Sequence, residues 1–162
     1  KELTKQYHSR VPFVKQLMQG VQRRLEDPRS SGSVRSLGGR KCRFDLWEPN
    51  TFDMHKAMPY KEAVAAHGPT TRLRRAYTYK ALNRLIQASA ADMTKQAMVD
   101  IYQSGKTPLL QVHDELAFSV NSEEEAIGYA EAMENAINIK VPCKCDIDYG
   151  PSWGEARPLG NS

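Results

Sequence analysis

The longest regular pattern of apolar positions lies in the middle of the chain. Apolar side chains recur there at steps of three and four, the spacing of one buried helix face: Leu82, Ile86, Ala90, Met93, Ala97 and Ile101. A threonine, Thr70 or Thr71, is suited to cap the start of this helix, and Gly105 is suited to end it. The pattern therefore predicts one long helix from residue 70 or 71 to residue 104.

A shorter helix is predicted near the start of the chain. Pro12 favours its first turn, with Ser9 or Arg10 before it, and the pair Asp27-Pro28 ends it. Its apolar stripe has residues four apart: Phe13, Leu17, Val21 and Leu25. Residues 47–69 follow as an irregular region, in which one short helix is expected near residues 60–66.

Another helix is predicted after residue 122. Ser122 and Glu125 form a capping box, with Ser122 as N-cap and Glu125 as the third helical residue. Acidic side chains also suit the positive end of the helix dipole, so we interpret the glutamates here as helix-terminal and not catalytic. The buried face of this helix is expected to contain Ala126, Ile127, Ala130, Met133 and Ile137.

Strands are predicted between these helices. Residues 34–37 and 41–46 flank Gly38-Gly39, which predicts a hairpin. Its basic residues could contact phosphates or form a solvated face: Arg35, Arg40, Lys41 and Arg43. Residues 141–149 alternate between apolar and charged side chains, which is typical of a half-exposed strand with Asp146 and Asp148 on its polar face. Helices and strands in this order predict an α+β fold.

A second hairpin is predicted over residues 109–120. Two short β-like apolar runs flank a charged group of His113, Asp114 and Glu115. A straight strand would bury the Asp114 carboxylate among apolar side chains, at a cost of roughly several kcal/mol. A turn at His113-Asp114 avoids this cost, and both residue types tolerate the backbone conformations of tight turns.

The turn of this second hairpin carries candidate metal chemistry. Asp114 and Glu115 are adjacent hard oxygen donors, which suit magnesium or manganese. Taken as an isolated triplet, His-Asp-Glu in a loop is more often a solvated surface, since short motifs are only hypotheses. The choice between these interpretations depends on the flanking residues.

Composition and charge add a possible partner. The 162 residues are 40% hydrophobic and 26% charged, with a net charge of +4, which suits one ordinary globular domain and permits a nucleic-acid partner. Residues 1–84 hold 18 of the 23 lysines and arginines, and the rest of the chain is neutral to acidic. This division predicts a phosphate-facing half and a metal-facing half.

The cysteine and histidine residues indicate a cellular location but no metal site. An odd number of cysteines, Cys42, Cys143 and Cys145, without a signal peptide favours a reducing, cytoplasmic location. Cys143 and Cys145 are expected to be small core residues. His55 and His67 have no companion at ligand spacing and are expected on the surface. No apolar run reaches the ~20 residues of a membrane span, so no membrane partner is expected.

The long helix offers a nucleic-acid surface. A second stripe beside the apolar one contains Tyr79 or Lys80, then Asn83 and Gln87. Arginine and lysine side chains in its first turns can hold phosphates, and amides can reach the minor-groove acceptors, which are nearly alike for every base pair. Sequence-independent binding and an ordinary exposed helix face are both open on these grounds.

Five strings of residues, in order, resemble the C-terminal part of family-A DNA polymerases, the family of bacterial DNA polymerase I and many phage replicases. They are the helix region Tyr7–Leu25, the glycine hairpin Ser33–Arg43, the Asn83–Asp92 segment (N-x-x-x-Q-x-x-A-A-D), the hairpin Gln111–Leu116 and the terminal Gly150–Ala156 (G-x-x-W-x-x-A). Each string alone is weak, but five in this order are strong. Residues 47–70 have no counterpart and resemble a lineage-specific insertion.

The resemblance implies roles for individual residues. Asp114 would bind catalytic Mg²⁺ in a two-metal site, with Glu115 as its helper. The remaining implied roles are in DNA binding. His113 and Gln111 would lie near the primer terminus, Asn83 and Gln87 in the minor groove, and Arg74 near the template backbone. Tyr79 stands where bacterial members have an arginine, and the neighbouring Lys80 would replace that arginine.

The resemblance also implies an architecture. Residues 1–70 would contain a fingers-derived helix, a basic fingers-type hairpin and the insertion. Residues 71–158 would form the long DNA-facing helix and a palm with the catalytic hairpin, in which helices pack on a small antiparallel palm-type sheet, and residues 159–162 would be a tail. The implied partners are primer–template DNA and deoxynucleoside triphosphates.

Two parts of the family pattern do not occur in this chain. These are a second metal-binding Asp in a D-Y-S-like strand, and an R-x-x-x-K-x-x-x-Y helix that grips the nucleotide. Two-metal phosphoryl transfer needs ligands from both sides. We therefore expect a fragment or a subunit that needs an upstream polymerase segment. A non-catalytic DNA-binding module and a metal-dependent nuclease are the alternatives.

Overall fold

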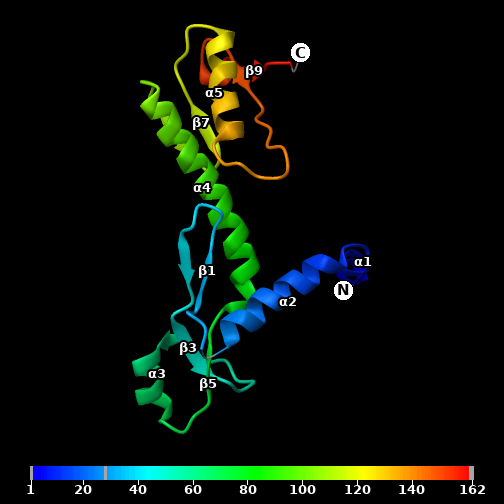
Figure 1. The fold of residues 1–162 in the computed structure, drawn as a ribbon, viewed down its shortest axis with the longest axis vertical. Coiled ribbons are helices and arrows are strands. Elements are labelled where there is room, and N and C mark those ends of the chain that lie inside the picture. The colour runs from blue at the N-terminus through cyan, green and yellow to red at the C-terminus, as the bar shows by residue number, and fades with distance from the viewer. Residues whose placement is uncertain (1, 28, 161–162) are drawn as a thin grey trace. The chain divides into compact units, whose positions relative to one another are not determined.

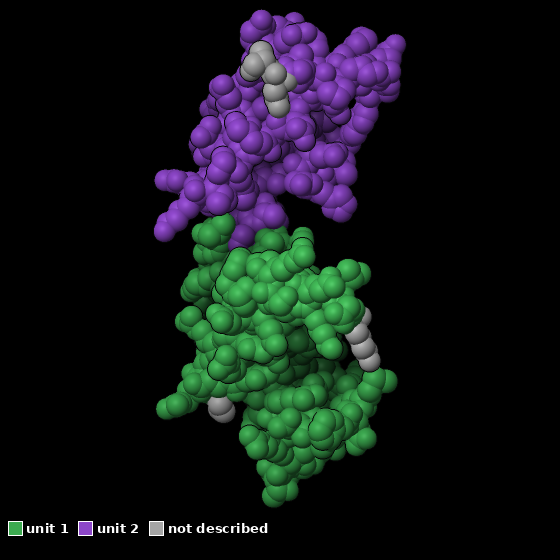
Figure 2. All heavy atoms as spheres, turned by 90° about the vertical axis from the view of Figure 1, so that its right-hand side faces the viewer, with its two compact units in different colours: residues 1–88 green, residues 89–162 purple. Residues whose placement is uncertain are grey.

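The computed structural model describes residues 2–27 and 29–160, which fold into helices and small antiparallel sheets (Figure 1). This mixture confirms the predicted α+β composition. The chain forms two compact units, residues 1–88 and residues 89–162 (Figure 2). The predicted domain division concerns function, and it stays a prediction.

Two helices open the first unit, α1 (Glu2–Arg10) and α2 (Pro12–Glu26). Pro12 is the first residue of α2, as predicted, but its N-cap is Val11 and not Ser9 or Arg10. Helix α1 was not predicted, because its sequence has no apolar stripe. Asp27 ends α2, and Pro28 lies outside the described residues.

The buried core of the first unit is small. Leu25, Phe44 and Ala81 form it, with the partly buried Val21 and Val34 packed against them. The first half of the α2 stripe does not reach this core, and Phe13 and Leu17 are exposed. The predicted apolar stripe therefore contributes to this core through its C-terminal half, where Val21 and Leu25 lie.

The predicted glycine hairpin forms, but its second strand is shorter than expected. Strand β1 (Ser33–Arg35) pairs antiparallel with β2 (Lys41–Arg43). The chain then leaves this sheet, since Phe44 turns into the core and β3 (Leu46–Pro49) pairs with β4 (Met58–Pro59) and β5 (Leu73–Arg75). Helix α3 (Tyr60–His67) confirms the short helix expected within the irregular region.

The long helix begins ten residues later than predicted, and neither Thr70 nor Thr71 caps it. Residues 73–75 form β5 instead, and the 3-10 turn η1 (Thr78–Lys80) precedes α4 (Ala81–Gln103). Tyr77, between them, has a left-handed backbone with φ of 60°, which a helix cannot continue through. Pairing of β5 with β3 therefore overrides the helical periodicity of this stretch.

Arg75 joins the parts of the first unit. Its guanidinium lies over the Trp47 ring, 4.4 Å from the centroid, and donates to the carbonyl oxygens of Phe44 (3.2 Å) and Ser30 (3.3 Å). A Cβ on Gly32 would approach the same guanidinium to 2.4 Å. Gly32 therefore leaves the space that Arg75 occupies.

Helix α4 buries the predicted stripe only in part, together with Ala81 outside the stripe. Ala81, Ala97 and Ile101 are buried, whereas Ile86 is 57% exposed and Ala90 is also exposed. The β1–β2 hairpin lies against the first half of the helix, where the Arg84 side chain donates to the Arg43 carbonyl oxygen (2.9 Å).

The end of α4 is as predicted. Gly105 has a φ of 89°, its amide donates to the carbonyl of Tyr102 (3.0 Å), and the Lys106 amide donates to that of Ile101 (3.3 Å). These two bonds form a Schellman motif, which favours glycine at this position.

The second unit contains the other predicted hairpin and helix. Strand β6 (Leu110–Val112) pairs with β7 (Glu115–Ala117), and α5 (Glu123–Asn135) follows. Ser122 is its N-cap and accepts the Glu125 amide (3.3 Å), which confirms the predicted capping. Two residues of the predicted buried face differ, since Ile127 is 40% exposed and Ile137 lies beyond the helix end.

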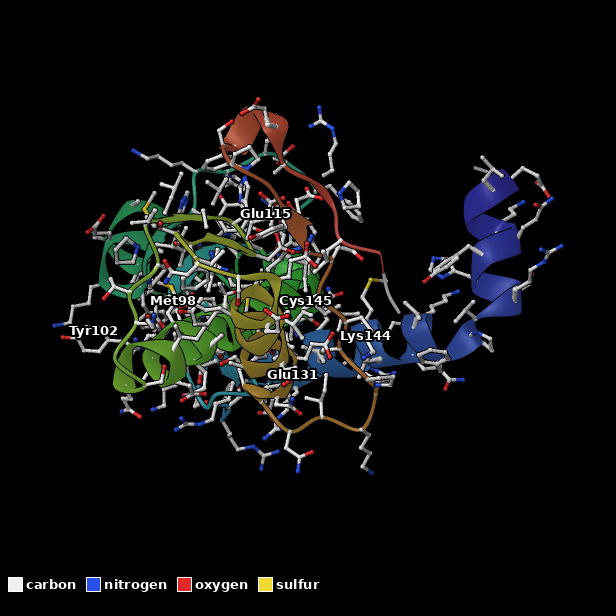
Figure 3. The ribbon with its side chains drawn as sticks, turned by 90° about the horizontal axis from the view of Figure 1, so that it is seen from above. Met98, Tyr102, Glu115, Glu131, Lys144 and Cys145 are labelled. Atoms are coloured by element: carbon white, nitrogen blue, oxygen red, sulfur yellow. The ribbon has the colours of Figure 1, made fainter. Side chains whose placement is uncertain are left out.

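The predicted strand 141–149 forms only in its last two residues. Strand β8 (Asp148–Tyr149) pairs with β9 (Arg157–Pro158), after the turn η2 (Trp153–Glu155). Burial alternates along the preceding residues, as predicted, with Cys143 and Cys145 partly buried. The Cys145 amide donates to the Glu134 carboxylate (2.8 Å) instead of to a neighbouring strand, beside Lys144 (Figure 3).

None of the helices in the described part of the chain is long and apolar enough to cross a membrane.

Candidate metal-binding hairpin and nucleic-acid-facing helix

His113 and Asp114 form the turn between β6 and β7. Val112 pairs with Glu115, so two residues remain for the connection. His113 adopts a left-handed backbone with φ of 53°, and the Gln111 side chain donates to its carbonyl oxygen. A histidine tolerates this conformation better than a β-branched residue would. The predicted bend at His113-Asp114 is therefore confirmed.

Asp114 and Glu115 are both exposed to solvent. Among residues 2–27 and 29–160, neither carboxylate has a hydrogen-bond or ion-pair partner. Asp114 lies in the turn, and the adjacent Glu115, labelled in Figure 3, is the first residue of β7. Both carboxylates are therefore free to take an external ligand.

These carboxylates fit part of a magnesium site. Hard oxygen donors suit Mg²⁺, which keeps several waters and takes one or two carboxylates together with substrate phosphates. Within the described residues, no three histidine, cysteine, aspartate or glutamate side chains are grouped to hold a metal ion. By itself the hairpin therefore has donors for only one side of such a site.

Glu125 fixes the base of the hairpin. Its carboxylate accepts bonds from Lys106 Nζ (2.6 Å), the Tyr129 hydroxyl (2.8 Å) and the Asn121 amide (2.9 Å). These donors, Lys106 first, lower the pKa of Glu125 from 4.5 to about 2. The Tyr129 ring also stacks on Phe118 with centroids 4.3 Å apart. Glu125 thus joins α5, the strand exit and the segment after α4, a role beyond the capping that was predicted.

Asn83 and Gln87 lie on α4 within the first unit. Both side chains are exposed and, being four residues apart, share one face of the helix. Ile86, which was predicted to be buried, is exposed beside them. Asn83 and Gln87 belong to the first unit and Asp114 to the second, so the prediction that the amides face the hairpin stays a prediction.

The two basic candidates have different surroundings. Arg74 lies on β5, and its Nε is 3.0 Å from the Glu48 carboxylate across the sheet, so its charge is already balanced. Lys80 ends η1, and its Nζ lies 5.1 Å from the centroid of the Tyr77 ring. Of the two, Lys80 is the more available for a phosphate.

Sequence reasoning missed a pair of histidines. His55 and His67 were expected separately on the surface, but both are partly buried and their ring centroids are 5.4 Å apart. His55 Nε2 bonds Thr51 (2.8 Å), while His67 Nε2 is buried without a hydrogen-bond partner in the described part of the chain. Twelve residues separate the two, so no local spacing could have shown the pair.

Comparison with known proteins adds to these observations. The model of the family described as DNA polymerase family A matches residues 1–155. A DNA-directed DNA polymerase of Pseudomonas phage M6 is 34% identical over 150 residues, which is 93% of this chain and 19% of the phage protein.

Bacterial proteins give similar matches. DNA polymerase I of Bacillus subtilis (strain 168) is 44% identical over 86 residues, 48% of this chain and 10% of that protein. The thermostable DNA polymerase I of Thermus thermophilus is 30% identical over 170 residues, 96% of this chain and 18% of that protein. The chain spans less than a fifth of the length of these relatives.

Proposed function

Because the chain belongs to DNA polymerase family A, we propose that it forms the C-terminal portion of the active site of a template-directed DNA polymerase. This activity is supported by the phage and bacterial relatives, which are named as DNA polymerases. The observation that carries the proposal is the β6–β7 turn, where Asp114 and Glu115 are exposed and have no partner in the part of the chain that the structure describes.

The proposed reaction is nucleotidyl transfer. The 3′-hydroxyl oxygen of the primer attacks the α-phosphorus of a deoxynucleoside triphosphate, a new P–O bond forms, and pyrophosphate leaves as the hydroxyl proton is lost. Asp114, with Glu115 beside it, would hold Mg²⁺ at this hairpin. Bound Mg²⁺ would supply Lewis-acid activation and balance phosphate charge.

Other residues of the chain would hold DNA. Asn83 and Gln87 can donate to minor-groove acceptors, which nearly every base pair presents alike. Lys80 and Arg74 would contact phosphates, and His113 and Gln111 would lie near the primer terminus. We assign the hairpin and α5 to a palm, and α2 with the β1–β2 hairpin to fingers.

An upstream polymerase segment would complete this site. One hairpin with two adjacent carboxylates cannot hold two metal ions from both sides. The same hairpin also exposes apolar side chains, since Leu109 is 72%, Leu110 45% and Val112 39% exposed. A further strand or helix against these side chains would remove that surface from water, and it could carry the missing Asp.

Primer extension tests this proposal. The purified chain should not extend a primer with Mg²⁺ and all four deoxynucleoside triphosphates. It should do so when combined with an upstream polypeptide that carries the D-Y-S-like strand and the nucleotide-gripping helix. Extension by the chain alone would refute the incomplete-site proposal, and inactivity of the combined proteins, both shown to be folded, would refute the polymerase assignment.

A further inference from the structure

A pocket of about 260 Å³ lies inside the first unit, between the end of β2 and the start of α4. Three of its lining side chains are cations, Arg43, Lys80 and Arg84, and one is a carboxylate, Asp45. The remaining lining is apolar or aromatic and includes Tyr77. The charges that face this pocket are therefore strongly unbalanced.

The three cations of this pocket have no ion-pair partner among the described residues. Arg74 nearby, in contrast, is paired with Glu48. All three are exposed. Such a cluster raises the local concentration of anions, and more so where the walls have a low dielectric constant.

Two of the cations are held in place before any ligand arrives. Arg84 donates to the Arg43 carbonyl oxygen (2.9 Å), and its guanidinium lies 5.1 Å from the centroid of the Phe44 ring. Lys80 Nζ lies 5.1 Å from the Tyr77 ring centroid. A guanidinium has five N–H donors, so Arg84 keeps donors for a ligand. Positioned side chains lose little entropy on binding.

The backbone at Tyr77 has an unusual conformation at this pocket. A φ of 60° is rare for a bulky residue and is energetically unfavourable. The Tyr77 carbonyl accepts the Lys80 amide (2.9 Å), which closes the turn that places Lys80 and the 44%-exposed Tyr77 ring at the pocket. Conformations of this kind are enriched where residues are positioned for ligands.

We propose that this pocket binds one phosphodiester group of a DNA strand through Arg43, Lys80 and Arg84. The proposal rests on the proposed function and adds two residues, Arg43 and Arg84, to its DNA contacts. Three cations and one carboxylate leave an excess of two positive charges, so a singly charged phosphodiester would be bound with net attraction. The Asp45 carboxylate would repel the additional charge of a free nucleoside triphosphate.

Binding of a labelled oligothymidylate to the full chain tests the pocket. Arg43→Gln removes an exposed cation whose side chain has no partner in the described part of the chain, so the fold should be kept. We expect affinity to fall about fivefold at low salt, and the slope of log K against log salt to decrease by about 0.7, the value for one phosphate contact on a single strand. Lys61→Gln, an equal charge change on α3 away from the pocket, should change neither.

NMR titrations identify the ligand. The amide signals of Arg43, Lys80 and Arg84 should move with the oligothymidylate and not with its uncharged methylphosphonate analogue. Tighter binding of dTTP than of the oligothymidylate at these signals would overturn the assignment to a DNA strand. Equal effects of Arg43→Gln and Lys61→Gln would overturn the proposal that this pocket binds DNA, and would leave the proposed function untouched. If the unmodified chain bound no DNA at all, the DNA-binding part of the proposed function would fail with it.

Discussion

Single residues decide what the β6–β7 turn can do. His113 takes the left-handed backbone, and the Gln111 side chain donates to its carbonyl oxygen. Asp114 and Glu115 are exposed and have no partner among residues 2–27 and 29–160. An exposed carboxylate avoids the free-energy cost of burying a charge. It can also bind a metal ion without first breaking a bond to the protein. The chemistry of the chain is therefore concentrated in two adjacent side chains.

Replacing Asp114 should separate chemistry from binding. In the combined enzyme, Asp114→Asn should reduce primer extension by at least about a thousandfold, the scale on which one group that stabilises phosphoryl transfer acts. Primer–template affinity should change little, because the phosphate contacts lie elsewhere. Asp148→Asn is the matched control, since Asp148 is also exposed, and it should leave extension unchanged. Normal extension by the Asp114 variant would refute the assigned site.

Glu125 should make the stability of the chain depend on pH. Its pKa is depressed from 4.5 to about 2 in the folded state, chiefly by the bond from Lys106, so its contribution is present above about 4.5 and is lost as pH falls towards 2. Glu125→Gln should lower the urea midpoint at neutral pH, and the difference from the unmodified chain should shrink at acidic pH. Glu123→Gln, in the same helical turn, should not show this change.

At the scale of elements, local signals and pairing compete. Helix α5 begins where Ser122 caps it and α4 ends where Gly105 allows a Schellman motif, both within a few residues of chain. The start of α4 follows no such signal, because the residues before it form β5 by pairing with β3. In this pairing Arg74 lies opposite Glu48, which is twenty-six residues earlier in the chain. Helix ends set by local bonds are therefore predictable, and those set by distant strands are not.

Two glycines should respond in opposite ways to alanine. Gly105→Ala should destabilise the chain by about 1–2 kcal/mol, since alanine is unfavourable at a φ of 89°. Gly128→Ala, inside α5 with no atom within 4 Å of the new Cβ, should stabilise it by about 0.5–1 kcal/mol. Urea unfolding monitored by circular dichroism measures both. Stabilisation by Gly105→Ala would contradict the assigned end of α4, and destabilisation by Gly128→Ala would contradict the open surroundings of Gly128.

The exposed face of α4 can be tested through its amides. Asn83→Ala and Gln87→Ala should each weaken primer–template binding by about 0.5–1.5 kcal/mol, the usual net value of one hydrogen bond. Gln103→Ala, an exposed amide at the end of the same helix, is the control and should have no effect. Fluorescence anisotropy with a labelled duplex gives the affinities. Unchanged binding by both variants would refute the minor-groove role.

The whole molecule divides its charge between the two units. Residues 1–88 contain 18 basic and 7 acidic side chains, whereas residues 89–162 contain 5 basic and 12 acidic ones. The first unit can therefore attract phosphates, while the second repels them unless cations are bound. This division agrees with DNA binding by one unit and metal binding by the other, as proposed.

Duplex binding by the chain alone should consequently be weak and sensitive to salt. If the chain makes two or three phosphate contacts, raising the salt from 50 to 200 mM should lower the affinity about tenfold or more. The reason is that binding releases counterions, and added salt opposes this release. Fluorescence anisotropy at several salt concentrations measures this slope. A slope near zero would mean that the basic unit does not contact the DNA backbone.

Much of the candidate site could be predicted because its determinants are local. The bend at His113-Asp114 follows from one carboxylate between apolar runs, and the exposed pair Asn83 and Gln87 follows from helical spacing. The pocket of Arg43, Lys80 and Arg84 could not be predicted, because its residues come from a strand and a helix start that only folding joins.

The sequence by itself determined the types of most elements, the hairpin turns, the C-terminal end of α4 and the cap of α5, because each depends on hydrogen bonds and side-chain periods within a few residues. Only the tertiary structure decided that residues 73–75 form a strand, that Ile86 is exposed and that His55 meets His67. These outcomes depend on which distant segments compete for the same surface and backbone bonds, and that competition is settled by the free energy of the whole packed unit.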